Sequence, residues 1–186
     1  STLLVYENNQ FSEVYRFTDV GPELNYINII QTDELGRVWF ATDGRGLTMF
    51  NEETWRNWQP TNSAMRHDAI RGMAVTKDMV YAGGSSAAGE GGVMIYDINK
   101  NEWVNYWPDE SELSGGGVEG IAVDKLGRAF FATSEGVLDI FDNGNWMHIP
   151  MPPIPNNQIL MTSDGIFDSD GNYWLGTEGF GLWRYN

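Results

Sequence analysis

The feature that most constrains this chain is a motif that returns along its length, a short apolar run followed by a glycine and a second apolar run. Its first copy is GRVWFAT at residues 36–42, followed by GLTMF at 46–50. The glycine that opens the second run recurs at Gly46, Gly92, Gly136 and Gly181, at spacings of 46, 44 and 45 residues. A period of this length is typical of four-stranded β-propeller blades. The spacing therefore predicts a repeat architecture rather than one irregular domain.

Each repeat is expected to form four short strands, here called a, b, c and d. In the first full unit they are predicted at 27–32, 37–42, 47–50 and 54–58, because each is a β-branched or aromatic run bounded by turn residues. Three a–b turns begin with Asp33, Asp124 or Asp168 and close with a glycine, which suits a tight hairpin. No window combines a 3.6-residue period with helix caps, so helices should be nearly absent.

The ends of the chain do not coincide with the ends of a blade. Residues 1–17 match strands c and d, because Phe11 lies 44 residues before Trp55. Full blades are expected at 25–58, 70–107 and 118–149, and strands a, b and c at 160–186. We therefore predict an all-β protein in which residues 1–186 form a single β-propeller domain of four blade units, each of four antiparallel strands. The units form a complete small ring or an arc of a larger ring.

Such an arc leaves apolar blade faces without a neighbour, and three arrangements could cover them. The chain could belong to a larger ring, two copies could form a homodimer, or the first strands could complete the last blade. Self-association is favoured for the chain alone, with Leu4 and Trp183 in strands at the joint. Strand a should be innermost, with Gly72 and Gly120 near the axis, where a missing side chain lets neighbouring blades approach.

Composition excludes several classes of partner. Eleven Lys and Arg residues against 26 Asp and Glu give a net charge of -15, which repels nucleic acid and anionic lipid. No apolar run of membrane-spanning length is present, and the first residues do not form a basic leader followed by an apolar core, so no membrane insertion is expected. The absence of cysteine excludes disulfides and thiolate metal sites, and it is compatible with both a cytoplasm and a bacterial envelope.

The repeat pattern D-x-x-G-x-x-W-[FL]-[AG]-T resembles the two-component regulator propeller repeat. Residues 33–50 and 168–185 fit it closely, residues 124–141 have Phe130 in place of the Trp, and residues 76–96 depart most from it. The resemblance implies a sensory propeller of a bacterial hybrid sensor kinase, located outside the cytoplasm, most readily in the periplasm. It implies a domain without catalytic residues that binds a ligand or mediates dimer contact. Whether a small molecule, a glycan or a protein binds is left open.

The default binding site of a propeller is the axial face, where the b–c and d–a loops converge. Trp107 and Phe180 are added as candidates because they do not recur, whereas the recurring Trp residues are expected to pack blades. For any single residue of these loops a solvated turn is favoured over a binding role, and the rim as a whole is the better candidate. The rim residues predicted to bind a ligand are Asp43, Arg45, Arg66, His67, Glu90, Trp107, Glu135, Glu178 and Phe180.

The alternative function is a propeller lyase or hydrolase similar to streptogramin lyase, with a divalent cation. It would need a histidine at the axial face, but His67 and His148 are the only two histidines and stand in unlike contexts. Ser134, Glu135 and His148 are an arbitrary triple rather than a catalytic triad. No catalytic residue is therefore predicted.

Neither phosphate nor metal has a convincing motif. The glycine-rich loop at 83–92 lacks the GK[ST] ending of a phosphate loop. DSDGN at 168–172 resembles the start of a calcium loop, but the position of the closing glutamate falls on Gly179, which favours a structural turn. No cofactor or metal site is expected, apart from a weakly bound divalent cation such as calcium.

Overall fold

The computed structural model describes residues 2–16, 26–51, 54–84, 91–153 and 161–186, and within them it contains strands but no helix. The described residues therefore include no helix that could cross a membrane. The strands are β1 Thr2–Glu7, β2 Gln10–Arg16, β3 Ile27–Thr32, β4 Val38–Thr42, β5 Leu47–Asn51, β6 Thr54–Trp58, β7 Ile70–Val75, β8 Met79–Gly84, β9 Val93–Asp97, β10 Glu102–Tyr106, β11 Val118–Val123, β12 Ala129–Thr133, β13 Val137–Asp142, β14 Asn145–Pro150, β15 Thr162–Phe167, β16 Tyr173–Thr177 and β17 Gly181–Tyr185.

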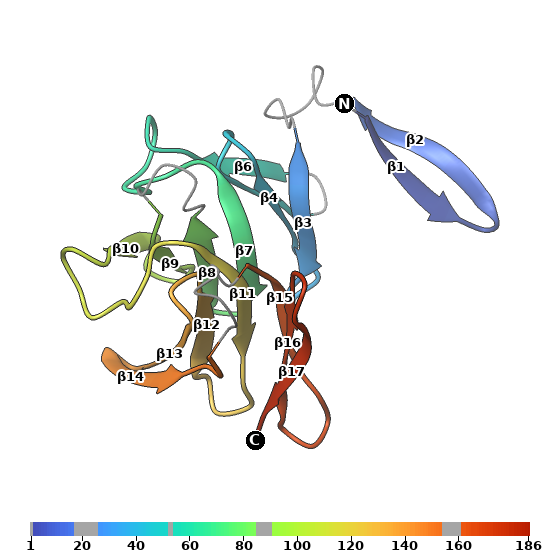
Figure 1. Ribbon diagram of the computed structural model, residues 1–186. Helices are drawn as coiled ribbons and strands as arrows, with labels where there is room; N and C mark the ends of the chain where they lie inside the picture. The colour runs from blue at the N-terminus through green and yellow to red at the C-terminus, as the bar shows by residue number, and fades with distance from the viewer. Residues whose placement is uncertain (1, 17–25, 52–53, 85–90, 154–160) are drawn as a thin grey trace.

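The strands form a series of antiparallel meanders, which are the blades of a β-propeller (Figure 1). We call β3–β6, β7–β10 and β11–β14 blades 1, 2 and 3; each is a four-stranded sheet. Blade 4, β15–β17, has three strands, and β1–β2 form a separate two-stranded hairpin. The all-β propeller prediction is confirmed, and the incomplete sheets are at the two ends of the sequence.

The first strand of each blade lies innermost. β3 contacts β7, β7 contacts β11, and β11 contacts β15, so the blades follow one another around an axis in chain order. A Cβ atom built on Gly72 would collide with backbone oxygens of Val118 and Glu119 in the next blade. One on Gly120 would press on Leu175 of the blade after that. These glycines therefore allow the close approach of innermost strands that the sequence predicts.

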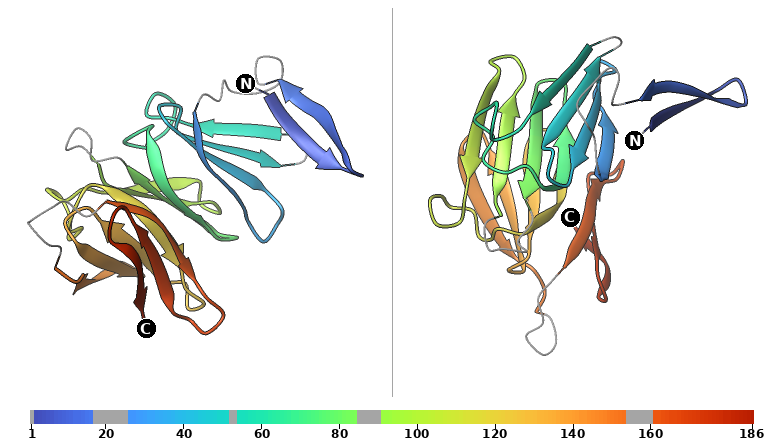
Figure 2. Two further views of the ribbon diagram at one scale, coloured as in Figure 1. Left: turned by 45° about the vertical axis from the view of Figure 1, so that its right-hand side comes forward. Right: turned by 90° about the horizontal axis from the view of Figure 1, so that it is seen from above.

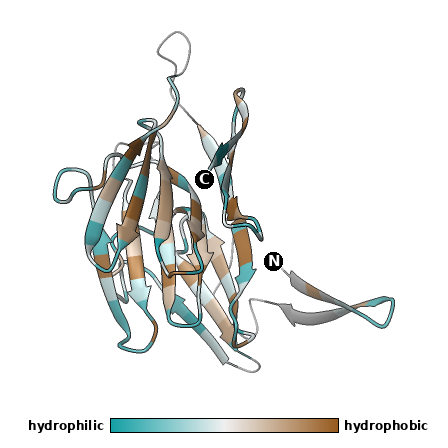
Figure 3. Ribbon diagram, turned by 90° about the horizontal axis from the view of Figure 1, so that it is seen from below, coloured by the Kyte–Doolittle hydropathy of each residue, from teal (hydrophilic) through white to brown (hydrophobic). Residues whose placement is uncertain are grey.

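Apolar side chains fill the space between successive blades. Trp39 and Leu47 of blade 1 are fully buried against Met73 and Tyr96 of blade 2, and the rings of Trp39 and Trp58 stack at 5.7 Å. Comparable clusters join blade 2 to blade 3 and blade 3 to blade 4. In Figure 3 the hydrophobic residues are concentrated on the strands, among hydrophilic ones, and most turns are hydrophilic.

The aspartate of the a–b turn is a recurring local brace. In blade 1 the carboxylate of Asp33 accepts hydrogen bonds from the backbone N of Leu35 and Arg37, from Arg37 Nε at 2.5 Å and from Trp39 Nε1 at 2.8 Å. Burial raises the pKa of Asp33, but the bonds from Trp39 and Arg37 outweigh it, so the pKa lies below its ordinary value. The same turn is built on Asp124 in blade 3 and Asp168 in blade 4.

The β1–β2 hairpin projects away from the blades (Figures 1 and 2). Leu4, Tyr6 and Phe11 on this hairpin are exposed. Trp183, which the sequence places at an open joint, instead packs on the cluster between blades 3 and 4. Side chains alternate along a strand, so the uncovered face of blade 4 carries its neighbour Leu182, 64% exposed.

Candidate functional site

Each innermost strand has a β-bulge directly after its first residue. The pairing register shifts between Ile27 and Ile29, between Ile70 and Gly72, between Val118 and Gly120, and between Thr162 and Asp164. A bulge leaves one residue out of the ladder and re-aims its side chain, and bulges are enriched beside active and binding sites. The bulged residues are Asn28, Arg71, Glu119 and Ser163.

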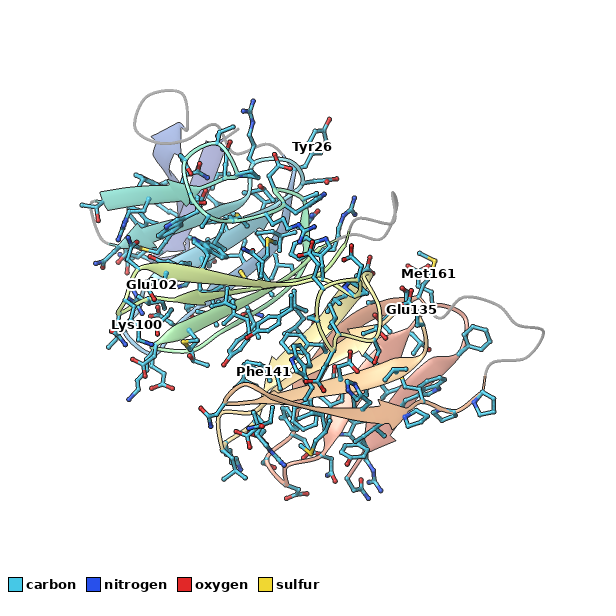
Figure 4. All side chains as sticks on the ribbon, turned by 90° about the vertical axis from the view of Figure 1, so that its left-hand side faces the viewer. Tyr26, Lys100, Glu102, Glu135, Phe141 and Met161 are labelled. Carbon is cyan, nitrogen blue, oxygen red and sulfur yellow. The ribbon has the colours of Figure 1, made fainter. Side chains whose placement is uncertain are left out.

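These bulges lie at the end of the molecule where the b–c and d–a loops meet. Backbone bonds join the two loop types there: Asp43 pairs with Ala69 in an isolated bridge, and Glu178 N donates to Met161 O at 2.8 Å. Figure 4 shows Tyr26, Glu135 and Met161 on this side of the molecule and Lys100 and Glu102 on the opposite side. We call this end, with the four bulged residues at its centre, the axial mouth.

Polar contacts cross between blades at the axial mouth. Arg71 of β7 donates to Asp43 Oδ2 of the blade 1 loop at 2.8 Å, and Asn28 Nδ2 of β3 donates to Ile70 O of blade 2 at 2.8 Å. Both partners of the ion pair are partly exposed, so it contributes little to stability. Its effect is to hold the guanidinium in place beside the axis.

Glu119 is a partly buried charge at the mouth. Burial raises the pKa of its carboxyl, the positive charge of Arg71 partly offsets this, and the negative charge of Glu178 adds to it. No hydrogen bond to a described residue contributes to that balance. The ionised carboxylate of Glu119 is therefore held at a cost, which is common for groups that act on a ligand.

Only part of the predicted rim gathers at the axial mouth. Asp43 lies there through its ion pair, and Glu178 lies close enough to Glu119 to affect its pKa. Arg45 is exposed on the same b–c loop as Asp43, and Phe180 is half-buried in the β16–β17 turn. Glu135 is bonded to Ser134 at 2.8 Å on the corresponding turn of blade 3. Glu90 lies outside the described residues.

Three other rim residues have structural roles. Trp107 is 5% exposed and belongs to the core between blades 1 and 2, so the prediction that it is an exposed binding residue is wrong. Trp107 lies in the loop after β10, outside the strand positions that recur, and closes this interface from there. Arg66 stacks on its ring at 4.5 Å and pairs with Glu110 at 2.6 Å. His67 Nδ1 accepts from Ala69 N at 3.0 Å and so shapes its own turn.

A serine, a histidine and an aspartate do meet in blade 3, but not as a catalytic triad. Asp139 is fully buried and accepts from Ser114 N and Ser114 Oγ, both at 2.7 Å. His148 Nδ1 lies 2.8 Å from Asp139 Oδ1 and 3.2 Å from Ser114 Oγ. A triad needs the serine and the aspartate on different ring nitrogens, whereas here both approach Nδ1. The cluster instead anchors the loop before β11.

The first carboxylate of the calcium-like loop, that of Asp168, is fully used within its own turn. Asp168 Oδ1 accepts from the backbone N of Asp170 and Asn172, and Oδ2 accepts from Asn172 Nδ2 and Trp174 Nε1 at 2.8 and 2.7 Å. These bonds, led by the one from Asn172, hold the pKa of Asp168 far below its ordinary range. Within the described part of the chain, no three His, Asp or Glu residues are placed to share a metal ion.

The bulged residues are not among those predicted from the sequence. Arg71 and Glu119 each stand directly before a glycine of strand a, the one signal that could have marked them. A regular alternation assigns such residues to one face of a strand, and a glycine after them does not by itself show that a bulge changes their direction.

Neither a protein-family model nor a curated protein matches the sequence. Solved structures do match the fold. The extracellular domain of a putative one-component system from B. thetaiotaomicron matches with a TM-score of 0.58 and 18% identity over 89% of this chain. PorZ of Porphyromonas gingivalis, a bacterial surface component of the type-IX secretion system, matches with a TM-score of 0.68 and 13% identity over 98% of this chain.

A gluconolactonase from Xanthomonas campestris also matches, with a TM-score of 0.65 and 15% identity over 97% of this chain and 63% of its own. The chain spans only 27% of the B. thetaiotaomicron domain and 29% of PorZ. That domain has also been described as part of a hybrid two-component system, so the resemblance to sensory propellers is supported at the level of the fold. The similarity extends to proteins of different activities, so the fold alone does not identify the ligand.

Proposed function

We propose that this chain is part of a noncatalytic sensory propeller of a bacterial envelope protein, exposed to the periplasm, and that its ligand binds at the axial mouth. The observation that carries the proposal is Glu119, a half-buried carboxylate without a hydrogen bond to a described residue, set beside Arg71 at the centre of the mouth. A charge retained at a cost to stability is typical of binding sites. The extracellular sensor domain among the structural neighbours supports the location.

The charges at the mouth favour a ligand with an amine. Asp43 already pairs with Arg71, so the positive charge of Arg71 offsets the burial of Glu119 only in part, and Glu178 adds a second negative charge nearby. An ammonium group would compensate Glu119 through a charge-assisted hydrogen bond, whereas a phosphate, or a carboxylate on a ligand without an amine, would meet repulsion. The proposed ligand class is therefore a small organic amine, including amino acids and diamines.

The proposal is tested by calorimetric titration of the chain with a panel of amino acids and diamines, with inorganic phosphate as the expected nonbinder. Glu119→Gln should weaken amine binding about tenfold or more, since it removes the charge from one hydrogen bond. It should not destabilise the fold, because it removes an unfavourable ionisation. Glu34→Gln, an exposed carboxylate of the a–b turn, is the matched control and should bind as the parent does. Equal affinity of the parent chain and the Glu119 variant, or no amine binding by the parent, would refute the proposal.

The gluconolactonase among the neighbours makes lactone hydrolysis the second candidate. The divalent cation of this alternative comes from the resemblance to streptogramin lyase. An assay of lactone opening with and without calcium separates the two candidates. We expect only the background rate in both conditions. Calcium-dependent turnover by the purified chain would replace the sensory proposal.

A further inference from the structure

Blade 4 has an apolar surface on the side away from blade 3. Ile166 of β15 lies opposite Trp174 of β16, and Leu182 of β17 lies opposite Gly176, two residues further along the same face. Ile166 and Leu182 are exposed, at 66% and 64%. We call Ile166, Trp174 and Leu182 the open face.

The β1–β2 hairpin carries a second exposed apolar surface. Tyr6 lies opposite Phe11 with the ring centres 4.9 Å apart, and Leu4 precedes Tyr6 by two residues on the same face. All three side chains are more than half exposed. We call Leu4, Tyr6 and Phe11 the hairpin face. Because the hairpin stands apart from the blades in Figures 1 and 2, this face is accessible to another molecule.

The open face is the counterpart of the face of blade 1 that blade 2 covers. Trp174 corresponds to Trp39, because each donates from Nε1 to the aspartate of its own turn. Leu182 corresponds to Leu47, because each directly follows the recurring glycine of its repeat. Trp39 and Leu47 are fully buried. The open face therefore has the residues of a surface that is covered elsewhere in the same chain.

The hairpin face is the counterpart of the surface with which blade 2 covers blade 1. Met94, Tyr96 and Trp103 of blade 2 belong to the core between these two blades. Tyr96 lies opposite Trp103 with the ring centres 4.9 Å apart, and Met94 precedes Tyr96 by two residues. The hairpin face has the same arrangement, a cross-strand aromatic pair at the same separation and an apolar residue two positions before it.

We propose that the hairpin face of one copy of this chain packs on the open face of a second copy. The contact continues the interface between blades 1 and 2 from one molecule to the next. Arg184 takes the place of Met49 on the open face, and its guanidinium lies 5.7 Å from the centre of the Trp174 ring. An arginine so placed favours an aromatic partner such as Tyr6 or Phe11.

The proposed contact joins two different surfaces, so it is heterologous. Two copies that each supply a hairpin and an open face can close a dimer through two identical contacts. This inference does not depend on the ligand proposed for the axial mouth.

Single charged variants and their mixture test the contact by light scattering over a range of concentrations. Leu4→Glu changes the hairpin face and Leu182→Glu the open face, and both side chains are exposed, so the fold should persist. Each variant alone should associate about thirtyfold more weakly or worse, as for residues at the centre of an interface. An equal mixture should recover a 1:1 pair, because one copy retains its hairpin face and the other its open face.

Leu35→Glu is the matched control, since Leu35 is equally exposed but lies in the β3–β4 turn, outside both faces. It should keep the mass of the parent chain. Phe11→Glu is a second variant of the hairpin face and should act as Leu4→Glu does. Ile30→Glu changes the face of blade 1 directed away from blade 2, the competing cover for the open face, and should have no effect.

The proposal is overturned if the parent chain is monomeric, if Leu4→Glu or Leu182→Glu keeps the mass of the parent, or if their mixture stays monomeric. Dissociation by Ile30→Glu instead of Leu4→Glu would assign the contact to blade 1 and overturn it as well.

Discussion

Blades 1 and 4 can be compared at the sheet face that packs against the next blade along the chain. On blade 1 this face is covered by blade 2, and on blade 4 it is not covered by a described blade. On blade 1, Trp39 and Leu47 are fully buried under blade 2. At the corresponding positions of blade 4, Trp174 is half-buried and Leu182 is 64% exposed. Both Trp residues nevertheless donate to the aspartate of their own turn, at 2.8 and 2.7 Å.

The comparison separates what a blade does alone from what its neighbour adds. The bond from Trp to Asp joins residues six positions apart and forms in both blades, so it belongs to the hairpin. Burial of the indole depends on the next sheet. A propeller blade therefore has local hairpin order, and most of its hydrophobic stabilisation comes from adjacent blades, as in other repeat proteins.

The largest expected effect is the difference between Trp39→Ala and Trp174→Ala. Both substitutions remove the same turn bond, but only the first leaves a cavity between packed blades. Trp39→Ala should lower the free energy of unfolding by about 3–5 kcal/mol. Trp174→Ala should cost about 1 kcal/mol, the value of the lost hydrogen bond with little cavity. Urea unfolding measures both, and equal losses would show that the neighbouring blade adds little.

A smaller effect should follow from adding one methyl group at equivalent glycines. A Cβ on Gly83 would collide with the backbone oxygen of Val118 in blade 3, which cannot rotate away. On Gly176, which has no following blade, the nearest atom would be Ser163 Oγ at 2.7 Å, the end of a small side chain. Gly83→Ala should cost about 1–3 kcal/mol by overpacking. Gly176→Ala should stay within about 0.5 kcal/mol, and a reversed order in thermal unfolding would contradict the assigned contacts.

The sequence predicts those features of the structure that recur from blade to blade. Recurring motifs at a fixed period predicted the class, the blade register and the close approach at Gly72 and Gly120, because those features repeat. The burial of Trp107 and the bulge at Arg71 occur once or arise from backbone geometry. A single sequence therefore predicted the axial end of the propeller as the candidate site but not the bulged residues at its centre.

Acidification should test the brace that blades 1 and 4 share. The folded-state pKa of Asp33 lies below its ordinary value of 3.8, since the bonds from Trp39 and Arg37 outweigh burial. Asp33 therefore binds its proton more tightly in the unfolded chain than in the folded one. The stability that the ionised Asp33 contributes is present above about pH 4 and is lost as pH falls further. Asp33→Asn should lower the unfolding free energy at pH 7 by about 1 kcal/mol.

The same variant should flatten the loss of stability between about pH 5 and pH 2, measured by urea unfolding at each pH. Glu34→Gln, next to it in the turn but exposed, is the control and should keep the slope of the parent. An unchanged slope in the Asp33 variant would mean that other carboxylates carry the acid sensitivity.

The smallest effect on stability is expected for Leu182→Glu, because this side chain is already in solvent on the uncovered face of blade 4. The free energy of unfolding should change by less than about 0.5 kcal/mol. We nevertheless expect it to change assembly, since the 186-residue chain alone should associate through uncovered apolar faces, and a charge there opposes desolvation. Light scattering at micromolar concentration should give a higher mass for the parent than for Leu182→Glu. Trp183→Glu should instead destabilise the fold, because its side chain packs between blades 3 and 4. A parent chain that is cleanly monomeric would show that the uncovered face does not drive association.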